Sequence, residues 1–204
     1  MAKELTRKER EHQARKDEIL KAALKLFAQK GYYQTSISEI AEAAEFSIGT
    51  LYGFFKNKEE LFFTMFRGVL EEIAGEVQAK MAEAGGPREK LKALIESLFG
   101  YFEHRYEAFD ILFAARKDLD PALKDEMGET IHEMQLTFQK NLVAIIQDGI
   151  NQGIFRPLRP EEMALTFMGL VNGSAFMWIE SGRSYSIRER VPEILEIFYR
   201  GVEK

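Results

Sequence analysis

Apolar residues recur three and four positions apart along almost the whole chain, and this spacing predicts a protein built from helices. Glycine and proline rarely interrupt the pattern in the way that short strands require. The first stripe runs from Ile19 to Phe27, and Lys30-Gly31 then supplies a basic last turn and a glycine stop. The first helix is therefore expected to end near residue 30.

Capping residues divide the next part of the chain into two very short helices and one long helix. Serine and asparagine are favoured at the start of a helix, and a glutamate three residues later completes a capping box. The caps are Ser36 with Glu39, Ser47, and Asn57 with Glu60. The long helix is expected from Lys58 to Met81, before the break at Gly85-Gly86-Pro87.

The remaining helical stretches are separated by breaks that contain proline or glycine. They are expected near residues 88–106, 108–116, 121–152, 160–181 and 187–202. The expected fold is all-α with about nine helices. Residues 1–57 would form a small head, and residues 58–204 a larger helical body that begins with a connecting helix, 58–81.

Charge is unevenly distributed along the chain. Residues 1–30 hold nine basic and five acidic side chains, a net charge of +4, so the rest of a chain with net charge −5 carries −9. A positive end on an acidic body is expected where that end alone meets phosphate, although a mixed-charge helix is more often a solvated face. Cysteine is absent, which excludes disulfides, thiolate metal sites and cysteine nucleophiles and fits a reducing compartment.

The sequence indicates neither export nor insertion into a membrane. The N-terminus is too polar for a secretory leader, so a cytoplasmic location is expected. The uncharged stretch Met163–Ile179 is shorter than the roughly 20 residues that cross a bilayer, and it contains Asn172. We expect a helix covered on both faces, by its own core and by a partner.

The two short helices have the features of a helix-turn-helix, in which small residues lie where the helices cross. Ala41 and Ala44 are the small residues, and Ile40 and Leu51 are placed to enter the core of the head. The second short helix would direct its N-terminal end, at Ser47, into the major groove of DNA.

About residues 13 to 62 resemble the DNA-binding head of the TetR family. The resemblance is carried, in this order, by residues 31–41, residues 47–52, Phe55 and residues 58–61. The resemblance implies a transcriptional repressor that binds near-palindromic double-stranded DNA as a homodimer and is released by a small, largely apolar effector. An activator is the alternative. By the same resemblance, phosphates are contacted by Thr35, Ser36, Ser47, Tyr52 and Lys58, and base edges are faced by Ile48, Gly49 and Thr50.

Two positions depart from the family pattern. Glu45 replaces a frequent glycine in the turn and is expected to avoid a left-handed backbone, which costs on the order of 1 kcal/mol. Gly53 removes a side chain that could contact DNA from the reading helix. Since Ile48, Gly49 and Thr50 cannot form bidentate hydrogen bonds with bases, thymine methyl contacts, close backbone approach and DNA shape are expected to do more of the reading.

The body is rich in aromatic residues and methionine, and the chain holds 16 Phe, 8 Met and 7 Tyr. Such stripes are more often ordinary core than a pocket, but the resemblance implies an effector inside this bundle. The expected apolar lining is Phe102, Tyr106, Phe109, Phe113, Met134, Phe138, Phe167, Met168 and Val171. Candidate polar contacts to the effector are His104, Arg105, Arg116 and Gln135.

Residues 160–202 resemble the two helices that pair with a second subunit in the family. The expected interface consists of Gly169, Gly173, Phe176, Met177, Ile194 and Phe198. A two-fold dimer would present two heads to successive turns of DNA, and effector binding would change their spacing by moving the connecting helix.

Two other classes of function were weighed. An all-α enzyme is disfavoured because His12, His104 and His132 lie on separate segments and no catalytic motif is present, so no catalytic residue, cofactor or metal site is expected. A helical ligand- or protein-binding module with weak or lost DNA binding is the stronger rival, because Gly53 and the uncharged reading helix weaken direct readout. Salt-dependent binding to operator DNA separates this module from a regulator.

Overall fold

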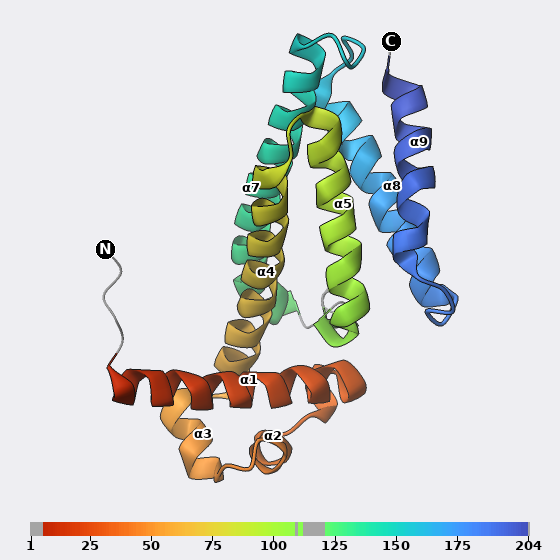
Figure 1. Cartoon of the computed structure of the whole chain (residues 1–204). Coiled ribbons are helices and arrows are strands. Elements are labelled where there is room, and N and C mark those ends of the chain that lie inside the picture. Colours follow the sequence, from red (N-terminus) through yellow and green to blue (C-terminus); the bar gives the residue numbers. More distant parts are fainter. Residues whose placement is uncertain (1–5, 109, 112–120, 204) are drawn as a thin grey trace. The chain divides into compact units, whose positions relative to one another are not determined.

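The structure, a computed structural model, describes residues 6–108, 110–111 and 121–203, without the side chains of residues 121–132 and 134–135. In this part of the chain helices dominate and no strand occurs, apart from one isolated antiparallel bridge between Phe155 and Glu203 (Figure 1). The expected all-α fold is confirmed. The chain divides into two compact units: Met1–Glu71 with Tyr106–Gly128, and Glu72–Arg105 with Glu129–Lys204. The expected boundary after residue 57 stays a prediction.

The first unit contains the helix-turn-helix. It holds α1 (Arg7–Gln34), α2 (Ile37–Ala43), α3 (Ile48–Phe54), the first part of α4 (Lys58–Glu83) and the start of α7 (Pro121–Asn151), up to residue 128. Gly31 interrupts α1 with φ 78° and ψ 168°, a conformation that favours glycine. The regular part of α1 therefore ends at Lys30, as predicted, and one further turn leads to Gln34.

The predicted capping residues start the helices at the expected places. The Ser36 hydroxyl accepts a hydrogen bond from the Glu39 amide (3.2 Å), and the Glu39 carboxylate accepts one from the Ser36 amide (2.9 Å), which completes a capping box. The Ser47 hydroxyl accepts from the Thr50 amide (3.1 Å). Asn57 caps α4 by accepting from the amide three residues on (2.8 Å).

The turn between α2 and α3 overturns one expectation. Glu45 has φ 59°, so it adopts the left-handed conformation that it was expected to avoid. The reason lies in the hydrogen bonds that end α2: the Glu45 amide donates to Glu42 (3.1 Å) and the Phe46 amide donates to Ala41 (2.9 Å). Closing a helix end in this way requires a residue with a left-handed backbone. The two hydrogen bonds offset the cost of that backbone at Glu45, about 1 kcal/mol, and the exposed side chain of Glu45 adds no buried charge.

A small apolar core holds the head together. Helices α1 to α4 contribute to it, and the members are Ile19, Ala23 and Phe27 from α1, Ile40 and Ala41 from α2, Leu51 from α3, Phe55, and Leu61 and Phe62 from α4. Burying a large apolar side chain contributes about 1.5–3 kcal/mol, so this core can fix the orientation of α3. Ile40 and Leu51, which were expected in this core, are buried in it, as is Ala41, the small residue expected where the helices cross.

The second unit is built from the helices of the body. They are α5 (Pro87–His104), α7 (Pro121–Asn151) from residue 129 onward, α8 (Pro160–Glu180), the short 3₁₀ helix η1 (Ile187–Arg190) and α9 (Val191–Val202). Helix α9 packs on α5 and on α8, and all three helices contact η1. The rings of Phe167 in α8 and Phe198 in α9 meet edge to face at 5.0 Å. The predicted stretch 108–116 lies largely outside the described residues.

The connection from α7 to α8 is tied to the end of the chain. The Arg156 amide donates to the Val202 carbonyl (2.6 Å), and the ring of Phe155, which has no exposed surface, stacks on Tyr199 at 6.3 Å. Phe155 fits because residue 149 is glycine: a Cβ atom there would lie 2.3 Å from the Phe155 ring. The packing of this corner therefore depends on Gly149.

Candidate DNA-reading head and effector-binding body

Helix α3 exposes two of the three predicted base-reading residues, Ile48 and Gly49, whereas Thr50 is half-buried. Leu51 is buried and anchors the helix, whereas Ile48 and Tyr52 are 47% and 55% exposed and Gly49 is also exposed. The Thr50 hydroxyl lies 2.8 Å from that of Ser47, so both hydroxyls gather at the N-terminal end of α3. The exposed end of α3 is thus uncharged, and it carries the large side chains of Ile48 and Tyr52 and the hydroxyls of Ser47, Thr50 and Tyr52.

Gly53 lies on the exposed part of the same helix. A Cβ atom built there would have no neighbour within 4 Å, so packing does not require glycine at this position. The space beside residue 53 is open to solvent.

Ser36 belongs to an exposed polar cluster at the start of α2. Its hydroxyl lies 2.9 Å from the Ser38 hydroxyl and donates to the Glu39 carboxylate, which also accepts from Lys30 at 2.5 Å. These bonds, above all the one from Lys30, lower the pKa of Glu39 from 4.5 to about 2. The carboxylate is therefore ionised and locally neutralised, beside a hydroxyl that was predicted to meet a phosphate.

Thr35 and Lys58 have their polar groups engaged within the protein. Thr35 is 1% exposed, and its hydroxyl donates to the Gly31 carbonyl at 2.9 Å, with the Leu26 carbonyl at 3.3 Å. The Lys58 ammonium donates to the carbonyls of Tyr32 (3.0 Å) and Thr35 (3.1 Å). The structure thus places both residues at the corner between α1 and α2, and phosphate contacts from them stay a prediction.

An aromatic cluster that the sequence analysis did not single out supports this corner. Tyr32 packs against Phe27 and Phe62, and its hydroxyl donates to the Glu59 carboxylate at 2.8 Å. Burial, followed by this hydrogen bond, raises the pKa of Tyr32, and hydrogen bonds from its own amide and from Tyr32 lower the pKa of Glu59. No helical spacing links these residues, because Phe27 and Tyr32 lie five positions apart on either side of Gly31.

The first turns of α1 project basic side chains from the head. From Arg7 to Glu18 no side chain is buried, but the His12 ring stacks on Phe54 at 4.5 Å and the Lys16 ammonium lies 5.7 Å from the centre of the Phe55 ring. These contacts fix the start of α1 against the end of α3. From residue 6 onward, the predicted positive end is therefore part of the head and packs against α3 and Phe55.

The predicted pocket residues fall into both units. Phe102, Phe167 and Val171 are buried in the core of the second unit, where Phe138 and Met168 are half-buried. Tyr106 belongs to the first unit. Phe109, Phe113 and Arg116 lie outside the described residues, as do the side chains of Met134 and Gln135. A pocket lined by this set stays a prediction.

Arg105 has a partner within the body. Its guanidinium donates to one oxygen of Glu72 (2.8 Å), and the Tyr101 hydroxyl donates to the other oxygen (3.0 Å). Burial and this bond raise the pKa of Tyr101. Residues 72–105, the end of α4 followed by α5, form one helical hairpin of the second unit. Glu72 and Arg105 are its first and last residues, so the bonds among Glu72, Tyr101 and Arg105 join the two ends of this hairpin. His104, another candidate polar contact, is exposed.

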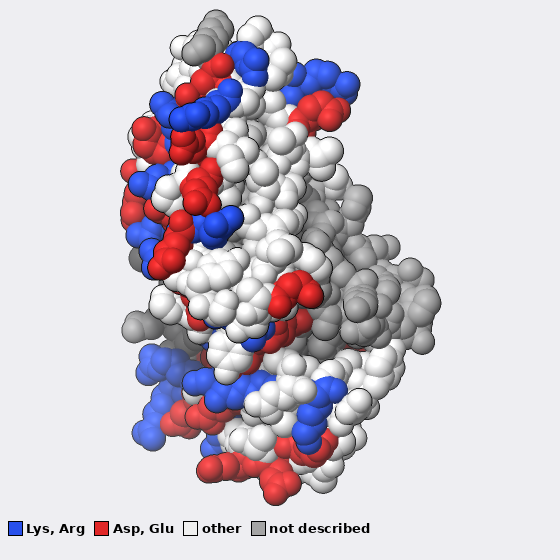
Figure 2. Space-filling model, turned by 90° about the vertical axis from the view of Figure 1, so that its right-hand side faces the viewer, with Lys and Arg blue, Asp and Glu red and all other residues white. Residues whose placement is uncertain are grey.

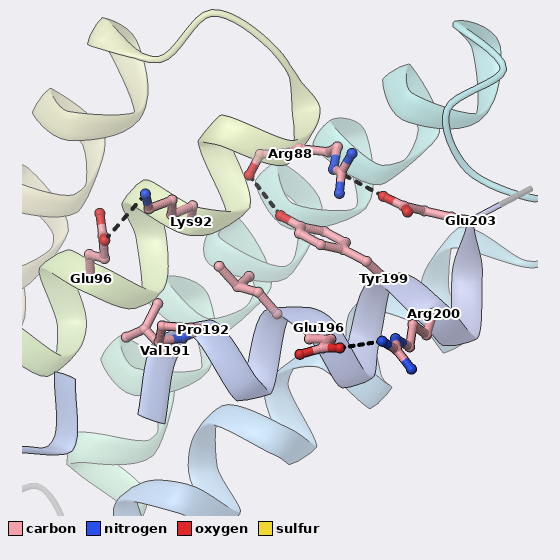
Figure 3. Close-up of a pocket in the computed structure, with 10 residues that line it drawn as sticks. Arg88, Lys92, Glu96, Val191, Pro192, Glu196, Tyr199, Arg200 and Glu203 are labelled. Carbon is pink, nitrogen blue, oxygen red and sulfur yellow. Dashed lines mark hydrogen bonds and ion pairs between the residues drawn. The ribbon is translucent and has the colours of Figure 1, made fainter. Parts of the chain in front are cut away.

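A groove of about 490 Å³ runs between α5 and α9 (Figure 3). Its apolar lining comes from α9 and consists of Val191, Pro192, Leu195 and Tyr199. Its charges are paired: Arg88 with Glu203 (2.9 Å), Lys92 with Glu96 (3.8 Å) and Arg200 with Glu196 (2.5 Å). Because each of the three cations already has a carboxylate, the groove offers no net charge to a ligand.

One face of α8 is exposed and almost uncharged. It carries Leu165, Gly169, Gly173, Phe176 and Met177, and α9 adds Ile197, which is 61% exposed. Figure 2 shows a continuous uncharged area where α8 and α9 reach the surface. Ile194 and Phe198, which were expected at the same interface, are buried in the core of their own unit. No helix in the described part of the chain is long and apolar enough to cross a membrane.

Two family models match the chain. Residues 19–65 match bacterial regulatory proteins of the tetR family, and residues 84–202 match the tetracyclin repressor-like C-terminal domain. The second match alone covers more than half of the chain.

The chain is also similar to individual regulators over nearly its full length. The HTH-type transcriptional repressor KstR2 from Mycolicibacterium smegmatis is 29% identical over 189 residues, which are 93% of this chain and 91% of the relative. Among solved structures, the fatty acid degradation regulator FadR from Bacillus halodurans aligns with a TM-score of 0.81 at 22% identity and covers 98% of each chain. FadR from Bacillus subtilis, solved in complex with stearoyl-CoA, aligns with a TM-score of 0.79 at 22% identity, over 92% of this chain and 99% of that one.

Proposed function

Because the chain belongs to the TetR family of bacterial regulatory proteins, we propose that it represses transcription by binding a near-palindromic operator as a homodimer, and that a largely apolar effector releases it. The family membership confirms the resemblance drawn from residues 13 to 62 and the prediction of a DNA-binding transcriptional regulator. The observation that carries the proposal is the exposed, uncharged end of α3, which is held by the buried Leu51.

We place the DNA contacts on the exposed part of the head. Ile48, Gly49 and Thr50 face base edges, where Ile48 reads thymine methyl groups and Gly49 allows a close approach of the backbone. Ser36, Ser47 and Tyr52 contact phosphates on either side of the groove. With no arginine or asparagine on this face, DNA shape supplies part of the specificity.

We assign the dimer interface to the uncharged face of α8 and to Ile197 of α9. Phe176 and Met177 supply apolar area, and the exposed glycines Gly169 and Gly173 allow a helix of the second subunit to approach closely. This face is the same on both subunits, as a two-fold interface requires. Ile194 and Phe198 support it from within the core.

The proposed effector is amphipathic, with a long apolar part such as the acyl chain of a fatty acyl thioester. Support comes from the buried aromatic and apolar side chains of α5 and α8, namely Phe102, Phe167 and Val171, and from two relatives whose names refer to fatty acid degradation or stearoyl-CoA. An apolar pocket with a few polar contacts suits such a ligand. The site of action is the cytoplasm, where both operator and acyl thioester are found.

The test is a selection of random duplex DNA on the purified protein, followed by titration of the selected site at several salt concentrations. We expect a palindromic motif whose affinity falls with salt and falls further in Tyr52→Ala. Adding stearoyl-CoA should release the DNA, whereas coenzyme A without an acyl chain should not. If no motif is enriched and no salt-dependent binding occurs, the rival function of a helical ligand- or protein-binding module replaces this one.

A further inference from the structure

Helix α1 begins well before the part of the head that the family model matches. The match starts at residue 19, whereas α1 starts at Arg7, so residues 7–18 extend the helix by about 18 Å. The extension opens with a capping box: the Thr6 hydroxyl accepts from the Glu9 amide (3.3 Å), and the Glu9 carboxylate accepts from the Thr6 amide (2.7 Å). No side chain of residues 7–18 is buried, so the core of the head does not account for this extension.

One face of the extension is basic. Residues three, four, seven and eleven positions apart share a face of a helix. Counted back from Ile19, which is buried in the head, these positions hold only basic or histidine side chains. We call them the basic stripe, and its members are Lys8, His12, Arg15 and Lys16. The stripe thus continues the core-facing side of α1 beyond the core itself.

The acidic residues of the extension leave this charge largely unopposed. Residues 7–18 hold five basic and four acidic side chains, so the arrangement of the charges matters more than their sum. In the part of the chain that the structure describes, Lys8 and Arg15 are exposed and form no ion pair. Three of the four acidic residues are bonded elsewhere within α1: Glu9 to Thr6, Glu11 to Arg7, and Asp17 to Gln13.

Two contacts join the basic stripe to the end of the reading helix. The His12 ring stacks on Phe54 at 4.5 Å, and the Lys16 ammonium lies 5.7 Å from the centre of the Phe55 ring. Figure 1 shows the N-terminal half of α1 beside α3. Lys8 lies four residues, about 6 Å of helix, beyond the His12 stack. The stripe is therefore continuous with the surface of α3, whose own residues, 48–54, carry no charge.

We propose that the basic stripe is a second DNA-binding surface, in which Lys8 and Arg15 bind phosphates next to the bases that α3 reads. The contacts of His12 and Lys16 hold the stripe on α3. The inference rests on the proposed function and deepens it, because it assigns two tasks to two surfaces. The uncharged α3 reads the sequence, and the stripe supplies affinity for the phosphate backbone that does not depend on sequence.

The test is the double variant Lys8→Gln with Arg15→Gln, in which only exposed side chains change. Each neutralised phosphate contributes about 0.9 to the slope of log K against log salt, so two residues in each of two heads account for about 3.6. We expect a slope lower by about this amount and at least about tenfold weaker operator binding at 0.1 M salt. The selected DNA motif should stay the same, because phosphate contacts carry no sequence information.

Lys21→Gln with Lys25→Gln is the matched control. Both lysines are exposed on α1, and they lie nine residues, or two and a half turns, after His12 and Lys16, on the opposite face. This variant removes the same charge and should keep the wild-type slope. In ethylation interference the stripe variant should lose phosphates from the footprint, whereas the control should retain all of them. Equal losses of slope in the two variants would overturn the proposal, since overall charge would then explain the effect.

Titration of a duplex of arbitrary sequence separates this inference from the proposed function. If selection enriches no motif, the proposed repressor function fails, but the stripe should still give salt-dependent binding to the arbitrary duplex, and the stripe variant should lose it. A stripe variant with the wild-type slope on the selected operator would refute the inference and leave the function intact. A wild type that binds neither duplex would refute both.

Discussion

Replacing Gly149 by alanine should destabilise the body, although the same change normally stabilises a helix. Alanine is favoured over glycine inside a helix by about 1 kcal/mol. At residue 149, however, the new Cβ atom would lie 2.3 and 2.4 Å from two carbons of the Phe155 ring, far inside van der Waals contact. The aromatic ring is rigid, and Phe155 is fully buried, so the ring or α7 has to move.

The size of the effect follows from two limits. Overpacking of a core costs about 1–3 kcal/mol, and complete loss of a buried phenylalanine costs about 3–5 kcal/mol. After the gain in helix propensity is subtracted, we expect Gly149→Ala to lower the free energy of unfolding by about 2 kcal/mol. For a chain of this size the midpoint of thermal unfolding should fall by about 4–8 °C.

The assay is urea denaturation followed by circular dichroism at one protomer concentration, because the stability of a dimer depends on concentration. Gly75→Ala is the matched control: Gly75 is exposed in α4 and a Cβ atom there meets nothing within 4 Å, so this variant should be stabilised by up to about 1 kcal/mol. In a Phe155→Leu background, Gly149→Ala should lose most of its cost. Equal stabilisation by both alanine variants would refute the steric argument.

Three other predictions concern the polar clusters and the interface. The Glu39 carboxyl should titrate near pH 2 by NMR, and Lys30→Met should return its pKa toward 4.5. Because folding lowers this pKa, the stabilisation by ionised Glu39 is complete above pH 4.5 and is lost as the pH falls from 4.5 toward 2. Phe176→Glu should convert the proposed dimer to a monomer in analytical ultracentrifugation and abolish cooperative operator binding, whereas a dimer that persists would exclude α8 as the interface. Glu72→Gln should loosen the α4–α5 hairpin, which hydrogen exchange would show as faster exchange of amides around Tyr101, with a stability loss of about 1 kcal/mol.

Most of the helices could be predicted because their signals are local. The capping box of Ser36 and the cap at Ser47 act within one turn, and the glycine at residue 31 ends the regular part of α1 through its own backbone. The apolar stripes then define which face of each helix is buried, as Leu51 in α3 illustrates. Local chemistry of this kind is fully present in the sequence.

The expectation for Glu45 was wrong because a local penalty was weighed without its compensation. The left-handed backbone costs about 1 kcal/mol by itself, but it lets the Glu45 and Phe46 amides satisfy carbonyls at the end of α2. Those bonds join residues three and five positions apart, so the compensation belongs to the whole turn, which a propensity at one residue does not contain.

The sequence by itself determined the all-α fold, the helix-turn-helix and the exposed end of α3, since each follows from spacing and capping within a few residues. Only the tertiary structure decided which side chains of those helices pack against one another. It turned Lys58 toward the end of α1, buried Ile194 and Phe198 within their own unit, and set Phe155 against Gly149. These choices join residues far apart in the chain, and periodicity shows that a face is apolar without showing which surface will cover it.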